Sequence, residues 1–334
     1  MQILTRRCIV LGALATPLAL NAQGIPQASG QASGPTWPPA TIKIVVPYPP
    51  AGSTDVIARL VQNGLQQRLG TSVIIENRAG ASGSIGTAVV AKSPPDGSTW
   101  LIVFDNHAAN PFVLPSLGYD TEKDLDPVLL IGTAPYVLST GPQKLFKTLG
   151  DVIAAARARP ATISYASVGS GSVGHLALVL LSKQAGVALV HVPYRGGGPA
   201  MNDTLAGHVD LLIASTALSI PQIQAGAIRA VAQTGSARAP ALPEVATVSE
   251  SGFPGFEARA WWGVFAPTGT PKPIVKRFAA ELAACLREPQ VTKQLTETQQ
   301  VSLALSDGEA LREFLREQMR VWGAVAREHS ITAD

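Results

Sequence analysis

The segment IKIVVPYPPAGSTD, residues 42–55, contains a structural step that recurs along this chain: a strand, a tight turn and the start of a helix. Four of its first five residues are β-branched and apolar, as expected for a buried strand. The prolines that follow fix the backbone, and the small residues 51–53 let backbone amides approach a ligand closely. An amphipathic helix is predicted over 54–69, and Gly70 stands where a left-handed cap belongs.

A second turn of the same type, SVGSGSVGH at 167–175, follows the predicted strand 163–166 and opens another helix. Amides at a helix N-terminus carry partial positive charge, so a small anion can bind there without a cationic side chain. Two such turns predict one anionic ligand held from both sides, which indicates a binding protein rather than an enzyme. The structural alternative is that Ser53, Thr54 and Ser172 serve only as helix N-caps.

The second turn also matches the dinucleotide pattern G-x-G-x-x-G through Gly169, Gly171 and Gly174. That pattern expects an acidic residue about twenty positions further on, and residues 184–201 contain none. Anion binding is therefore favoured over dinucleotide binding. The five histidines lack the spacing of metal ligands, and no G-x-S-x-G nucleophile motif occurs. No catalytic residue, metal or cofactor is predicted.

Residues 1–22 have the pattern of an export signal, with Arg6 and Arg7 before an uncharged apolar run and a cleavage site after Ala22. The general and twin-arginine export routes both remain open. Residues 23–38 are uncharged and rich in small residues, which predicts a disordered spacer. Loss of the two arginines lowers the net charge from +3 to +1, which argues against nucleic acid as a partner. A periplasmic location is expected.

Strands and helices alternate along the chain, which predicts a parallel-rich α/β fold. About 295 ordered residues exceed one typical core, so two domains are expected. A last strand is predicted at 261–266, with helices at 273–286 and 307–328 that fold back on the first domain. Domain 1 is then 39–140 plus 257–334, and domain 2 is 141–256, with a hinged cleft between them. Cys285 is expected to be a packed core residue.

These motifs, in this order, resemble the Bug receptors, which are extracytoplasmic solute-binding proteins of tripartite tricarboxylate transporters. The resemblance runs from about Trp37 to the C-terminus. It rests on VPYPPAGSTD at 46–55, ENRAGASGSIG at 76–86, AKSPPDG at 91–97, the turn at 169–176, VPYRGG at 192–197, WWG at 261–263 and APTGTP at 266–271. The family implies a type II-like, two-lobed periplasmic-binding-protein (Venus-flytrap) fold without catalysis.

Family members hold a ligand carboxylate between the loop after the first strand and the loop before the domain-2 helix, often through ordered water. Those loops correspond here to 48–55 and 167–175. Polar residues at other strand ends are expected to face the same cleft. The predicted ligand-binding residues are Tyr48, Pro50, Ala51, Gly52, Ser53, Thr54, Asp105, Asn106, Ser167, Ser170, Gly171, Ser172, Val173, His175 and Ser215.

The family often has an acidic residue after the strand at 209–213, where it can meet the amine of an amino-acid ligand. This chain has Ala214 there, followed by Ser215, which predicts a carboxylate without an amino group. Asp105 is awkward for a polyanionic ligand, so it indicates a ligand hydroxyl or amine, or else it is solvated and without a role. His175 either contacts the ligand or caps its helix.

The expected partners are a small organic carboxylate and the membrane subunits of a tripartite tricarboxylate transporter. A sensor that presents its ligand to a sensor kinase is an alternative reading of the same fold. An exported nucleotide-using enzyme is a third. The protein is expected to be a monomer with no nucleic-acid partner.

Overall fold

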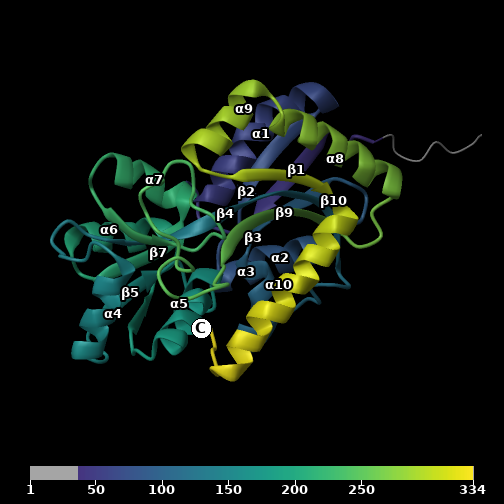
Figure 1. Cartoon of the computed structure of the whole chain (residues 1–334). Coiled ribbons are helices and arrows are strands. Elements are labelled where there is room, and N and C mark those ends of the chain that lie inside the picture. Colours follow the sequence, from purple (N-terminus) through teal and green to yellow (C-terminus); the bar gives the residue numbers. More distant parts are fainter. Residues whose placement is uncertain (1–36, 334) are drawn as a thin grey trace, which may run out of the picture. The chain divides into compact units, whose positions relative to one another are not determined.

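The computed structural model describes residues 37–333 (Figure 1). The predicted signal peptide and almost all of the predicted spacer lie outside the described residues. The first described residue, Trp37, donates its indole N–H to the Gly97 carbonyl at 3.0 Å. None of the helices within 37–333 combines the length and apolar character needed to span a bilayer.

Strands and helices alternate through most of the chain. The first half contains β1 (Thr41–Val46), α1 (Ser53–Leu69), β2 (Ser72–Asn77), η1 (Ala81–Gly83), α2 (Ser84–Ala91), β3 (Thr99–Phe104), α3 (Asn106–Val113), β4 (Leu125–Thr140), α4 (Leu149–Ala158) and β5 (Ser164–Ser167). The second half contains α5 (Val173–Ala185), β6 (Val190–Pro193), α6 (Gly197–Ala206), β7 (Leu211–Ser215), α7 (Thr216–Gln224), β8 (Arg229–Gln233), β9 (Arg259–Pro267), α8 (Lys272–Leu286), α9 (Pro289–Lys293), η2 (Gln294–Thr298), β10 (Ser302–Asp307) and α10 (Gly308–Glu328).

The long strand β4 joins two groups of strands. Its first half pairs with β9 and β10, and the order on that side is β2-β1-β3-β9-β4. Its second half pairs with β7 and β8, and the order continues β4-β7-β5-β6. Figure 1 shows β4 passing between the two groups. The first predicted turn follows β1, Asp105 and Asn106 follow β3, and the second predicted turn follows β5.

Strand β1 is buried on both faces, which explains its nearly continuous apolar sequence. Ile42, Ile44 and Val46 belong to the core under α1 and α8, whereas Val45 packs with the core under α2 and α10. This alternation follows from the two-residue period of a strand. Figure 1 shows the two pairs of helices on opposite sides of these strands. The sheet is thus a rigid support for the turn that follows β1.

The α/β prediction is confirmed, but two of its details are wrong. The sheet is mixed rather than parallel-rich, because β4 runs antiparallel to β7, β8, β9 and β10. Among the named strands of residues 37–333, the parallel pairs are β1 with β2 and β3, and β5 with β6 and β7. The strand predicted at 261–266 is also not the last, since β10 follows it. Cys285 is 1% exposed, as a packed core residue should be.

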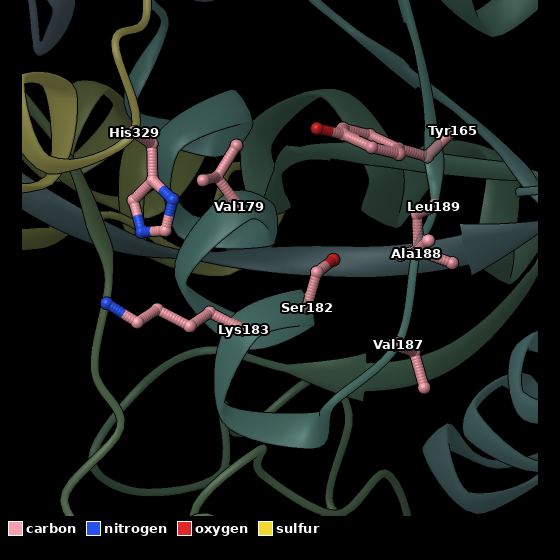
Figure 2. Close-up of a pocket in the computed structure, with 8 residues that line it drawn as sticks. All are labelled: Tyr165, Val179, Ser182, Lys183, Val187, Ala188, Leu189 and His329. Carbon is pink, nitrogen blue, oxygen red and sulfur yellow. The ribbon is translucent and has the colours of Figure 1, made fainter. Parts of the chain in front are cut away.

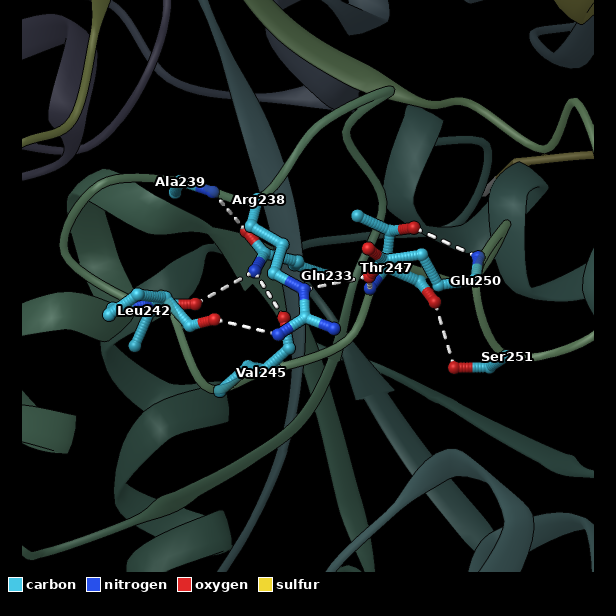
Figure 3. A network of polar contacts seen from close by, with 9 residues as sticks. Gln233, Arg238, Ala239, Leu242, Val245, Thr247, Glu250 and Ser251 are labelled. Atoms are coloured by element: carbon cyan, nitrogen blue, oxygen red, sulfur yellow. Dashed lines mark hydrogen bonds and ion pairs between the residues drawn. The ribbon is translucent and has the colours of Figure 1, made fainter.

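Gln233, at the end of β8, organises the long segment that leads back to β9 (Figure 3). Its side-chain Nε2 donates to the carbonyls of Leu242 and Val245 at 3.0 and 2.6 Å, and its Oε1 accepts from the Ala239 amide at 2.7 Å. An ion pair between Arg238 and Glu250, 2.8 Å apart, closes the same segment. One buried side chain thus replaces the hydrogen bonds that a helix or strand would supply.

Candidate functional site

The first turn is held rigid by Asp55 and ends in a helix without a side-chain cap. Asp55 accepts hydrogen bonds from the Ala51 amide, Arg59 and Asn77, each at 2.9 Å. Burial acts to raise the pKa of Asp55, but these hydrogen bonds outweigh it and lower the pKa. The N-cap of α1 is Gly52, so the structural alternative that Ser53 or Thr54 caps this helix is wrong, and no side chain makes a capping hydrogen bond there. A glycine cap leaves these amides for another acceptor.

Tyr48 connects the first turn to the end of β3. Its hydroxyl accepts from the Phe104 amide at 3.0 Å and donates to Asn106 Oδ1 at 2.5 Å. Burial raises the pKa of Tyr48 well above its usual value, so the phenol stays neutral. Asn106 and Asn110 both donate to the Ser82 carbonyl. Ser82 was not predicted as a site residue, although its glycine-rich turn between strand and helix is a usable signal.

The second turn is satisfied largely from within. The Ser172 hydroxyl accepts from the His175 amide at 3.3 Å and caps α5, and His175 Nδ1 accepts from the Gly171 amide at 3.0 Å. The His175 ring stacks on His191, with centroids 3.7 Å apart, and His191 Nε2 lies 2.7 Å from Ser167 Oγ. Burial lowers the pKa of His175 to about 3 and that of His191 to about 4. His175 therefore supports the turn as a neutral acceptor.

The two sides of the site are in contact. Ser82 Oγ donates to the Ser170 carbonyl at 3.4 Å. A Cβ atom on Gly171, whose φ is +72°, would lie only 2.5 Å from a methyl carbon of Val113 in α3. Both contacts join residues that are far apart in the sequence. The second turn is thus packed directly against η1 and α3.

Asp105 lies between these elements and is completely buried. Its Oδ2 accepts a hydrogen bond from the Tyr136 hydroxyl, while its Oδ1 has no partner among the described residues. Burial raises the pKa of Asp105 well above its usual value, against the opposing effects of Tyr136 and of the Val173 and Asn106 amides. The alternative that Asp105 is solvated is therefore wrong. Tyr136 has no local sequence signal that would have identified it.

The remaining predicted residues surround this centre. Ser215 is buried at the end of β7 and pairs in register with Tyr136 on β4. Pro50 and Ala51 are exposed on the first turn, whereas Thr54 is buried. Strand pairing and the contacts of Tyr48 and Asp105 thus bring residues from β1, β3, β4, β7 and α5 to one region.

Two hollows in the surface lie outside this region. One, of about 320 Å³, is lined by Tyr165, Val179, Ser182, Lys183, Val187, Ala188, Leu189 and His329 (Figure 2). The other, of about 380 Å³, is lined by Pro142, Ile223, Gly226, Ile228, Arg229, Ala230 and Val245. Neither contains a predicted ligand-binding residue. The helix N-termini and buried polar groups converge between the two turns, so we assign the candidate site there. In residues 37–333, no group of three or more potential ligands could hold a metal.

Comparison with known proteins identifies the family of this chain. The family model described as "Tripartite tricarboxylate transporter family receptor" (TctC) matches residues 57–331. Protein BugT of Bordetella pertussis is 36% identical over 298 residues, which are 89% of this chain and 91% of BugT. The structure of R. palustris Rpa4515 with adipate has a TM-score of 0.84 and 35% identity, over 89% of this chain and 99% of that one.

MatC (Rpa3494) from Rhodopseudomonas palustris, with bound malate, has a TM-score of 0.79 and 31% identity, over 86% of this chain and 99% of that one. These findings confirm the resemblance to the Bug receptors and the two-lobed fold of periplasmic solute-binding proteins. The chain belongs to the tripartite tricarboxylate transporter receptor family.

Proposed function

We propose that this protein is a periplasmic receptor that closes on a small organic carboxylate and delivers it to the membrane subunits of a tripartite tricarboxylate transporter. The observation that carries the proposal is the N-terminus of α1, which no side chain caps. Its partial positive charge suits a carboxylate. The rigid Asp55 network positions this end of the helix before any ligand arrives, which reduces the entropy lost on binding.

The ligand we propose is a carboxylate without an amino group. Ala214, which follows the β7 residues 211–213, is fully buried and offers no charge to an ammonium group. The adipate and malate in the names of the two similar structures also lack amino groups. Mature protein that binds aspartate or glutamate more tightly than succinate or glutarate would contradict this part of the proposal.

Closure requires two lobes, which we propose are 39–140 with 257–334, and 141–256. Support comes from β4, which changes its pairing partners between its first and second halves. The segment held by Gln233 then makes the return crossing to β9. Ligand would shift the population toward the closed state through its higher affinity for that state.

A thermal-shift screen of residues 23–334 against mono-, di- and tricarboxylates, amino acids, sugar acids and NAD tests this function. A ligand at 100 times its Kd should add about 2.7 kcal/mol of stability. The decisive variant is Gly52→Asp, because aspartate is a favoured N-cap that would occupy the α1 amides with its own charge. Gly52→Asn is the matched control, since it caps similarly without the charge.

We expect Gly52→Asp to fold with unchanged or higher stability and to lose carboxylate binding. Gly52→Asn should weaken binding less. Equal carboxylate affinity in Gly52→Asp and wild type would contradict an anchor at α1. A response to NAD alone would favour the nucleotide-using alternative instead.

A further inference from the structure

We propose that Asp105 binds the second carboxylate of a dicarboxylate ligand by donating a hydrogen bond from its own protonated carboxyl group. This inference rests on the proposed function and names the side chain that would bind the ligand carboxylate farther from α1. It differs from the first expectation, in which a charged Asp105 would repel such a ligand.

The position of Asp105 places it beside the proposed anchor. It follows β3, whose residues 99–101 pair in parallel with residues 43–45 of β1. The carboxyl ends of these two strands lie at one edge of the sheet, where the turn after β1 leads to α1. Tyr48 from that turn donates to Asn106, the immediate neighbour of Asp105. The proposed anchor and Asp105 therefore follow adjacent strands at the same edge of the sheet.

The amides at the start of α5 are poorly placed to bind a second carboxylate. Those of Gly171 and His175 donate to His175 Nδ1 and Ser172 Oγ, at 3.0 and 3.3 Å. The Ser172 amide donates to the Gly169 carbonyl at 3.2 Å. The Val173 amide faces the Asp105 carboxyl itself. A second ligand carboxylate at this position needs a donor from elsewhere.

Asp105 can supply that donor because its carboxyl has no counter-cation. No lysine or arginine in residues 37–333 pairs with it, and the side chain is completely buried. The titratable groups that face it are Tyr136 from β4 and Tyr48 from the β1 turn, both phenols with raised pKa values. A buried carboxyl without a cation is held neutral, and the raised pKa of Asp105 agrees with this.

The geometry decides which oxygen carries the proton. Oδ2 already accepts from the Tyr136 hydroxyl, and the Val173 and Asn106 amides also face the carboxyl, whereas no hydrogen bond of normal geometry reaches Oδ1 among the described residues. A proton on Oδ1 would therefore be an unused buried donor, and such groups call for an acceptor. A ligand carboxylate oxygen provides one, in a charge-assisted O–H···O hydrogen bond. No covalent bond changes, and the proton stays shared between the two groups.

The test uses ligands of equal chain length with and without a second carboxylate: adipate against hexanoate, and succinate against butyrate. Their Kd values are measured by calorimetry at pH 6 and pH 9 for wild type, Asp105→Asn and Asp105→Leu. Glu244→Gln removes an exposed charge and is the control. Asparagine keeps a donor that does not titrate, whereas leucine has a similar size and no donor.

For wild type and the control, we expect the second carboxylate to improve Kd at least tenfold at pH 6. That gain should shrink as the pH rises through the pKa of Asp105, which burial raises well above its usual value. The gain should persist at both pH values in Asp105→Asn and vanish in Asp105→Leu. Where a variant fails to fold, the wild-type comparison of adipate with hexanoate still tests the inference, because a second carboxylate that adds no affinity would overturn it.

Two results with the variants would overturn the inference: a gain lost in Asp105→Asn, or a gain retained by Asp105→Leu. If the monocarboxylates bind and the second carboxylate adds nothing, the inference fails while the proposed function stands. If no carboxylate binds, both fail together.

Discussion

Gly171 gives the sharpest test of closure, because a single methyl group there would be harmless in an open cleft and obstructive in a closed one. The alanine Cβ of Gly171→Ala would lie 2.5 and 2.9 Å from two side-chain carbons of Val113. The positive φ of +72° adds about 1 kcal/mol in either state. Overpacking of this kind adds roughly 1–3 kcal/mol, and it arises only where the second turn meets α3.

Under the proposed closure only the closed state carries the overpacking, so carboxylate affinity should fall by about 5- to 150-fold in Gly171→Ala. The matched control is Gly186→Ala, at the other end of α5. Gly186 has a similar φ of +62° but no heavy atom within 4 Å of the added Cβ. It should lose stability to a similar extent and keep its affinity. Calorimetric titration with a carboxylate found in the screen measures both effects.

A double-mutant cycle identifies the clash itself. Val113→Ala removes the methyl carbons at 2.5 and 3.2 Å from the new Cβ and keeps the Val113 Cβ at 2.9 Å, so Gly171→Ala with Val113→Ala should recover part of the lost affinity. A coupling free energy of roughly 1–3 kcal/mol is expected. If Val113→Ala rescues nothing, or Gly186→Ala loses as much affinity as Gly171→Ala, the contact between the second turn and α3 does not govern closure.

Three further predictions concern stability. Burial lowers the pKa of His107 to about 3, so its contribution to the free energy of unfolding is complete above pH 6.5 and is lost as the pH falls toward 3. Between pH 8 and pH 5, urea unfolding should show wild type losing about 2 kcal/mol more than His107→Asn, which keeps every other titrating group; equal losses would refute it. Gln233→Ala leaves three backbone groups without their hydrogen-bond partner and should lower the free energy of unfolding by about 3 kcal/mol or more. The exposed control Gln67→Ala should change it by no more than about 0.5 kcal/mol. Thr148→Ala removes the capping box with Asp151 and should cost about 1 kcal/mol in the same assay, with no loss expected if the cap is redundant.

The elements that the sequence did not predict contain residues that usually interrupt secondary structure. The first half of β4 includes Pro127 and Gly132, and its pairing with β9 shifts register beside both. Helices α3 and α7 contain Pro111 and Pro221. Proline and glycine inside a segment lower its predicted tendency to form a strand or a helix. Packing between distant segments outweighs that local preference here, and it cannot be read from periodicity alone.

For the candidate site, local sequence located the turns but not their partners. The glycines and small residues at 51–53 and 169–174 mark both turns without any knowledge of the fold. Tyr136 and His191 carry no such mark, because their roles depend on the pairing of β4 with β7 and of β5 with β6. Residues that complete a site across strands need the strand order, which the alternating pattern alone did not supply.

The same argument predicted both turns, but the amides of the two turns differ in whether side chains accept their hydrogen bonds. A glycine caps α1 and accepts nothing through a side chain, whereas Ser172 and His175 take up amides at the start of α5. A glycine-rich turn before a helix is therefore not sufficient for an anion site. What decides is which donors remain without an acceptor. Around α5 this depends on Asp105, more than sixty positions earlier in the sequence. A change at that single position could therefore alter ligand choice while both turns stay intact.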